Sequence, residues 1–214
     1  MIDVFKLLIS TSLNVLLSEP SDKYEYLEDL IEGFEITEVQ KAGAIFDVSK
    51  LDYLNAQHMA NLSHKEFINY LNPFLIELGI DINEHEKKDL LIESMRTSEN
   101  TLKGVASSLI CYFKNVNTYN EKAIEKFITS NQLLIDLKDK INNLEPWDES
   151  SLDNLLLQYR EEHELSVPKV NQPLRIALTG STNSPSLGLT LYLFNKQEVL
   201  KRLDQLIEYL HTKN

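Results

Sequence analysis

The sequence contains few of the residues that favour tight turns, with six glycines and six prolines among 214 residues. Folds built from many short strands place these residues at many of their turns. Strict alternation of apolar and polar residues, the pattern of a half-buried strand, is also absent. The scarcity of turn residues therefore argues against a β-sandwich and favours helices.

Cysteine is nearly absent, because Cys111 is the only one. A single cysteine cannot form an internal disulfide. It lies in the apolar run SSLICYF, and buried cysteines in such surroundings behave as small hydrophobic residues. We therefore expect an inert core thiol and a cytoplasmic protein.

No apolar run approaches the ~20 residues that a membrane-spanning helix requires. Residues 1–17 (MIDVFKLLISTSLNVLL) are apolar, but Asp3 stands where a signal peptide carries cations, and no small-residue cleavage site follows. This segment is predicted to be a buried helix. A membrane is not an expected partner.

Groupings of residues that could carry out catalysis are missing as well. The five histidines are scattered, and none pairs with another histidine or with the cysteine at metal-ligand spacing. His85 lies between Glu84 and Glu86, which predicts a solvated charged face more than a metal site. The run from Thr179 to Thr182 (TGST) lacks the lysine of a phosphate-binding loop. We expect no metal, no cofactor and no independent catalysis from this chain.

Negative charge is in excess, with 33 acidic against 21 basic residues and a formal net charge of -12. Long-range attraction to a polyanion is therefore weak or repulsive. The excess argues against a role with nucleic acid but does not exclude one, because binding depends on the local field. DNA is not an expected partner.

Helical periodicity dominates what is present and predicts an all-α fold. The last segment, 196–211, has apolar residues three and four positions apart: Val199, Leu200, Leu203, Leu206, Ile207 and Leu210. The same pattern follows Asn120, at Ile124, Phe127, Ile128 and Ile135. Ser63 and Glu66 form a capping box before a third apolar face. Ser150 or Ser151 is expected to cap a helix that carries Leu152, Leu155, Leu156 and Tyr159.

Two segments do not fit helix packing alone. Residues 171–180 read NQPLRIALTG and are followed by Ser184-Pro185, and residues 46–55 read FDVSKLDYLN. The first resembles the QPLR-x-ALTG…SP stretch of bacterial glutamyl-tRNA synthetases. The second is similar to the FD-x-x-KL-x-W-x-N stretch of that family, with Tyr53 where tryptophan is usual. Weaker matches occur in the same order: LEDLIEGF at 27–34, LSHKE at 62–66, LNPFL at 71–75, MR with TL at 95–102, and LKRL at 200–203.

The resemblance implies two packed helical subdomains that bind an anticodon, preceded by a helical segment that contacts the tRNA stem. The run NVNTYN at 115–120 is the best boundary between the subdomains. We therefore expect a stem-contact segment at 1–61, a first subdomain at 62–118 and a second at 119–214. The family's two catalytic motifs are missing, so the chain alone should be inactive. ATP and Mg²⁺ are expected only in a separate catalytic domain of a glutamate–tRNA ligase.

The same resemblance implies tRNA-binding residues. Arg175 stands where the family's QPLR arginine lies at the anticodon, and its planar fork can stack and bond to bases; a salt bridge to a neighbouring acid is the alternative. Ser184, Pro185 and Leu187 match the loop around the anticodon bases, although Pro185 could equally form a plain turn.

A second candidate contact pairs a cation with an aromatic ring. Lys50 and Tyr53 are three residues apart and share a face on a helix. A phosphate and a stacked base would suit this pair, but a half-buried tyrosine beside a solvated lysine is equally compatible.

One departure from the family concerns specificity. Some members carry an arginine two positions after the Met-Arg pair, where it reads the third anticodon base, and this chain has Ser98 there. A serine cannot make the two-pronged contact of an arginine, so we expect weaker discrimination between glutamate- and glutamine-accepting tRNAs. Arg96 could substitute for the missing arginine.

The alternative for the whole chain is a helical protein–protein adaptor that has lost RNA binding, which the net charge favours.

Overall fold

A computed structural model describes residues 48–116 and 118–213, and within these ranges the protein is helical and has no strand. The expected all-α fold is confirmed. The helices expected near residues 1–17 and 27–34 lie outside the described residues. In chain order the elements are α3 (Val48–Asn61), α4 (His64–Glu77), the short 3-10 helix η2 (Ile82–Glu84), α5 (Lys88–Arg96), α6 (Leu102–Phe113), α7 (Glu121–Phe127), α8 (Gln132–Asn142), α9 (Glu149–Glu162), α10 (Val167–Thr179), α11 (Leu187–Leu193) and α12 (Lys196–Lys213).

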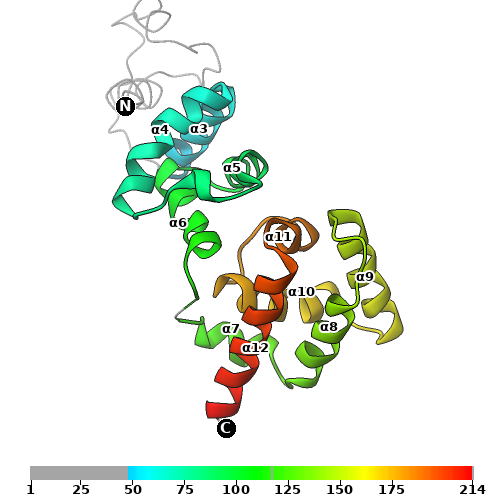
Figure 1. Ribbon diagram of the computed structural model, residues 1–214. Coiled ribbons are helices and arrows are strands. Elements are labelled where there is room, and N and C mark those ends of the chain that lie inside the picture. The colour runs from blue at the N-terminus through cyan, green and yellow to red at the C-terminus, as the bar shows by residue number, and fades with distance from the viewer. Residues whose placement is uncertain (1–47, 117, 214) are drawn as a thin grey trace, which may run out of the picture.

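The helices α3 to α6 enclose one hydrophobic core, which we call the first cluster (Figure 1). The α4 helix begins with the expected capping box, in which Ser63 Oγ accepts from the Glu66 backbone N–H and the Glu66 carboxylate accepts from the Ser63 N–H. Below this cap, Phe67 and Leu71 are fully buried. Both α4 and α5 pack on α6. The amphipathic pattern seen in the sequence thus forms the core of this half.

The helices α7 to α12 enclose a larger core, the second cluster. The α12 helix packs on α8 and α10, and α11 packs on α9 (Figure 1). The stripe expected on the last helix is confirmed: Val199, Leu203, Leu206 and Leu210 are buried, and Leu200 and Ile207 are half-buried.

Two local expectations for this half are wrong. The apolar pattern after Asn120 does not belong to one helix, because α7 ends at Phe127 and Ile128 is extended. Ser130 Oγ accepts from the Gln132 N–H at 3.1 Å, where α8 begins. Ile135 lies on this second helix and is 37% exposed. The cap of α9 is Asp148, whose carboxylate accepts from the Ser151 N–H at 2.8 Å.

The segment that connects the clusters is described at residues 114–116 and 118–120. Lys114 follows α6, and its Nζ donates to the Leu78 carbonyl at 2.7 Å. On the far side the Asn120 N–H donates to the Gly180 carbonyl at 3.1 Å. The clusters also touch directly, because the Tyr112 ring of α6 stacks on Phe194, with centroids 4.5 Å apart. The connection is therefore fixed at both ends.

His85 lies at this junction and not on a solvated face, which corrects the expectation for it. The imidazole is half-buried against the rings of Tyr112 and Phe113. Burial lowers the pKa of His85 below its ordinary value.

Among the described residues, no helix is long and apolar enough to span a bilayer.

Candidate functional site

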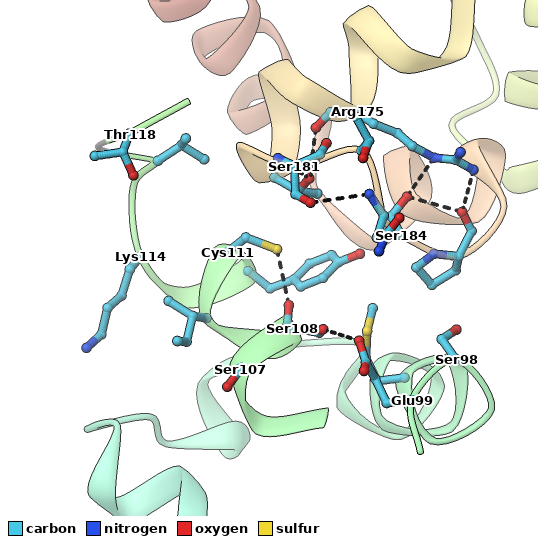
Figure 2. Close-up of a pocket in the computed structure, with 18 of the residues that line it drawn as sticks. Ser98, Glu99, Ser107, Ser108, Cys111, Lys114, Thr118, Arg175, Ser181 and Ser184 are labelled. Carbon is cyan, nitrogen blue, oxygen red and sulfur yellow. Dashed lines mark hydrogen bonds between the residues drawn. The ribbon is translucent and has the colours of Figure 1, made fainter. Parts of the chain in front are cut away.

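A cavity of about 880 Å³ lies between the two clusters (Figure 2). Its walls come from the end of α5, from α6, from the connecting segment, from α10 and from the loop that leads to α11. The lining residues are Met95, Ser98, Glu99, Ser107, Ser108, Ile110, Cys111, Tyr112, Lys114, Asn115, Val116, Thr118, Gln172, Arg175, Thr179, Ser181, Thr182, Asn183, Ser184 and Pro185. The structure thus brings together four of the residues singled out in the sequence: Ser98, Arg175, Ser184 and Pro185.

Arg175 is half-buried at the wall formed by α10. Its Nε donates to Ser184 Oγ and its Nη2 donates to the Pro185 carbonyl, both at 2.9 Å (Figure 2). Nη1 of the fork has no protein acceptor in the described part of the chain. Burial lowers the pKa of the guanidinium, which nevertheless stays charged at neutral pH. The salt bridge considered as an alternative for Arg175 is not formed in the described part of the chain.

The local sequence explains this placement. Gln172, Arg175 and Thr179 are three and four positions apart on α10, so they share the helix face that lines the cavity. Gly180 ends the helix with φ +74°, a left-handed conformation that glycine adopts without strain. The chain then turns back, and Ser184 and Pro185 come to lie against the arginine.

Ser98 and Glu99 form the opposite wall, at the connection between α5 and α6 (Figure 2). The Ser98 hydroxyl donates to the Ser94 carbonyl at 2.7 Å. Glu99 Oε1 accepts from the Ser108 hydroxyl at 2.5 Å. The cavity therefore has a guanidinium on one wall and a carboxylate on the other.

The polarity of the lining differs from that of the whole chain. Among the described lining residues, Lys114 and Arg175 are cationic, Glu99 is acidic, and many of the others are serines and threonines. The Lys114 ammonium is directed to the Leu78 carbonyl, so the guanidinium of Arg175 is the cation beside the cavity (Figure 2). Gln172 adds a buried Oε1 that has no hydrogen-bond partner among the described residues. A buried acceptor without a partner is rare in proteins. The cavity is thus equipped for a polar ligand despite the net charge of -12.

Arg96 does not reach the cavity, which corrects the expectation for it. Its side chain is only 9% exposed. The guanidinium donates to the carbonyls of Met59 and Ala60, at 3.0 and 2.8 Å, and to that of Leu62, and it lies over the Phe67 ring. These bonds satisfy the last carbonyls of α3 and tie that helix to α5. Arg96 is therefore a structural residue of the first cluster.

Leu187 requires a similar correction. It begins α11 and is 2% exposed, as part of the core of the second cluster. A side chain so placed cannot touch a base without unpacking the core. Its position orders the loop that carries Ser184 and Pro185.

Lys50 and Tyr53 lie on α3, away from the cavity lining. Tyr53 is 60% exposed, and Lys50 is half-buried three residues before it. As expected, the two residues lie on one helix, three positions apart, and so share a face of it. These residues form a separate surface of the first cluster.

Arg202 lies in the LKRL run at 200–203, for which the sequence predicted no structural or binding role. It is 2% exposed and joins three segments, because Nε donates to Glu198 at 2.7 Å, Nη1 to the Leu178 carbonyl at 2.5 Å, and Nη2 to the Lys114 carbonyl at 3.1 Å. Its guanidinium also lies 4.6 Å from the Phe194 ring centroid. One side chain thereby holds the connecting segment against α10 and α12.

Other lining residues were also missed. Glu99 directly follows Ser98, and Gln172 stands in the QPLR run, so their positions beside known candidates were the available signal. Cys111 lines the cavity and donates from Sγ to the Ser108 carbonyl at 3.3 Å. Burial raises the pKa of its thiol to about 12, which agrees with an inert cysteine.

Within the described ranges, no group of histidine, cysteine or acidic side chains could hold a metal ion.

Comparison with known proteins gives one family. Residues 66–207 match the family described as "Anticodon binding domain". The glutamate–tRNA ligase of Myxococcus xanthus is 32% identical over 190 residues, which is 87% of this chain and 40% of that protein. Glutamate–tRNA ligase 2 of Halorhodospira halophila is 29% identical over 86% of this chain and 39% of its own length. The chain therefore spans about two fifths of the length of these relatives.

Solved structures agree on the fold. A glutamate tRNA ligase from Elizabethkingia meningosepticum, solved in complex with its amino acid, superposes with a TM-score of 0.76 at 23% identity. The match covers 95% of this chain and 41% of that structure. A glutamate-tRNA synthetase from Elizabethkingia anophelis gives a TM-score of 0.74 at 21% identity. At these identities the likeness establishes the fold alone.

Proposed function

Because this chain belongs to the anticodon-binding domain family, we propose that it recognises tRNA by taking unpaired anticodon bases into the cavity between its two clusters. The observation that carries this proposal is the placement of Arg175. The side chain is held by Ser184 and Pro185, lines the cavity, and keeps one nitrogen of its fork without a partner among the described residues.

The chemistry of the lining supports the reading of bases. Recognition of single-stranded RNA uses hydrogen bonds to base edges and stacking on aromatic or guanidinium planes. Arg175 supplies donors and a plane, and the orphan Oε1 of Gln172 supplies an acceptor. The two bonds to the loop restrict the rotation of Arg175, so less conformational entropy is lost when a base binds.

The surface around Tyr53 would make a second contact. Its exposed ring and the neighbouring Lys50 lie on α3, outside the cavity. We assign this surface to the tRNA stem. We also treat residues 62–118 and 119–214 as the two subdomains, because the first and second clusters lie on either side of residues 115–120.

The wider activity follows from the relatives. We infer that the chain acts as the tRNA-recognition part of a glutamate–tRNA ligase in the cytoplasm, with ATP, Mg²⁺ and glutamate bound by another part of the enzyme. Glutamate-accepting and glutamine-accepting tRNAs are the proposed partners, and Ser98 in the cavity wall favours acceptance of the second.

The test is a filter-binding titration of the 214-residue chain with tRNA transcripts at two salt concentrations. Arg175→Ala should weaken binding about 10- to 100-fold, because stacking and base contacts are each worth roughly 1–3 kcal/mol. The salt dependence should stay the same, because a base contact releases no counterions. Arg175→Lys should also bind weakly, since it keeps the charge and loses the fork.

Arg160→Ala is the matched control. Arg160 lies on α9, outside the cavity lining, and donates to Asn171 at 3.4 Å. Its removal should leave affinity within about twofold of the parent. Equal losses in both variants, or no binding of any tRNA by the parent, would contradict the proposal; the second result would instead fit an adaptor.

A further inference from the structure

Among the residues that the structure describes, Glu99 is the only acid that lines the cavity. A carboxylate repels phosphate, so an RNA group that approaches it must present hydrogen-bond donors. The role of this acid therefore decides which base the cavity accepts.

The carboxylate is fixed in position. Oε1 accepts from the Ser108 hydroxyl at 2.5 Å. Oε2 lies above Gly104, in the first turn of α6, where a Cβ added to the glycine would be 2.8 Å away. The absence of a side chain at Gly104 thus makes room for the acid, and the nearby N-terminus of α6 favours its negative charge.

Most of the acceptor capacity of Glu99 remains unused. An ionised carboxylate offers about four lone-pair sites, and the Ser108 hydroxyl occupies one. Resting on the proposed function, we propose that Glu99 is a specificity-determining residue that accepts hydrogen bonds from the Watson–Crick edge of guanine. Guanine presents two adjacent donors there, N1–H and the N2 amino group, which match the two carboxylate oxygens. Cytosine presents one donor and two acceptors on the same edge. Its acceptors would be repelled by the carboxylate oxygens, which also carry lone pairs.

Ser98 strengthens this assignment. Its hydroxyl hydrogen is directed to the Ser94 carbonyl, so it does not supply a donor for the acceptors of cytosine. The wall formed by Ser98 and Glu99 therefore offers acceptors to a base. Glutamate and glutamine anticodons share their first two bases, a pyrimidine and uracil, and end in cytosine and guanine respectively. Guanine occurs only in the last place of the glutamine anticodon, so this wall favours glutamine-accepting tRNA.

The experiment compares two transcripts that differ only in cytosine or guanine at the last anticodon base. The parent chain should bind the guanine form about tenfold more tightly, the lower part of the range for one two-pronged contact. Glu99→Gln keeps the size of the side chain and an acceptor for Ser108, but it replaces one acceptor by a donor. This variant should lose the preference and bind the cytosine form as well as the parent does or better.

Gly104→Ala provides an independent variant that keeps the acid. The new Cβ would displace the Glu99 carboxylate, while alanine favours the helix. The guanine preference should fall without loss of thermal stability. Glu125→Gln, on the exposed surface of α7, is the matched control and should keep the preference.

The outcomes separate this inference from the proposed function. Equal or tighter binding of the cytosine form by the parent overturns the role of Glu99, and so does a preference that survives both variants. If neither transcript binds better than one with an unrelated anticodon, the proposed function itself fails and this inference fails with it.

Discussion

The substitution Arg202→Ala would remove a buried guanidinium that joins the connecting segment, α10 and α12. Two of its bonds go to the carbonyls of Leu178 and Lys114, and its third partner is Glu198. A hydrogen bond to a charged group contributes about 1.5–3 kcal/mol. Glu198 is 25% exposed and keeps Lys201 at 3.2 Å, so the loss comes mainly from the two carbonyls. The two bonds to carbonyls together predict that the free energy of unfolding falls by about 3–6 kcal/mol.

The assay is urea unfolding followed by far-ultraviolet circular dichroism. With a slope of about 2 kcal/mol per molar urea, the midpoint should fall by about 2 M. Lys201→Ala is the matched control, because its side chain is 50% exposed and its contacts with Glu198 and Asn115 are both solvated; its cost should stay below about 0.5 kcal/mol. A midpoint of Arg202→Ala within about 0.3 M of the parent would refute the assignment of Arg202 as the residue that joins the clusters.

Two further predictions concern a turn and a titrating contact. Gly180→Ala should destabilise the protein by about 2–3 kcal/mol, measured as a lower thermal midpoint, because φ is +74° and the new Cβ would lie 2.8 Å from the Thr118 carbonyl oxygen. Gly79→Ala, with φ +64° and nothing within 4 Å, should cost only about 1 kcal/mol, and equal losses would show that the contact is unimportant. The hydrogen bond with Glu93 raises the pKa of His64, so its stabilisation is complete below the unfolded pKa of about 6.5 and is lost as pH rises through the higher folded pKa. The difference in urea midpoint between the parent and His64→Gln should therefore shrink from about pH 5 to about pH 9, and a constant difference would argue against the titration.

Local patterns predicted much of the fold. The capping box at Ser63 and the stripe on α12 depend on residues three or four positions apart, and such neighbours meet on any helix. The break between α7 and α8 was missed because residues 129–131 (TSN) contain neither glycine nor proline. Asp148 was missed because three residues within four positions, Asp148, Ser150 and Ser151, could each cap a helix.

The site was predictable only in part. Arg175, Ser184 and Pro185 lie within ten positions of one another, and the turn at Gly180 brings them together. The partners of Arg96 are carbonyls 34 to 37 residues earlier in the chain, and no local pattern indicates such contacts. Glu99 became a candidate only when the packing of the clusters placed it opposite Arg175 (Figure 2).

Binding of RNA in the cavity would change the stability of both clusters together. Its walls belong to both clusters, so any shift of one cluster against the other alters the contacts of a bound molecule. Occupancy and rigidity are then thermodynamically linked, and a ligand at one hundred times its dissociation constant adds about 2.7 kcal/mol to stability. An RNA held there would raise the melting temperatures of the two halves together and slow amide exchange along residues 114–120, whereas an RNA held only on α3 would protect the first cluster alone.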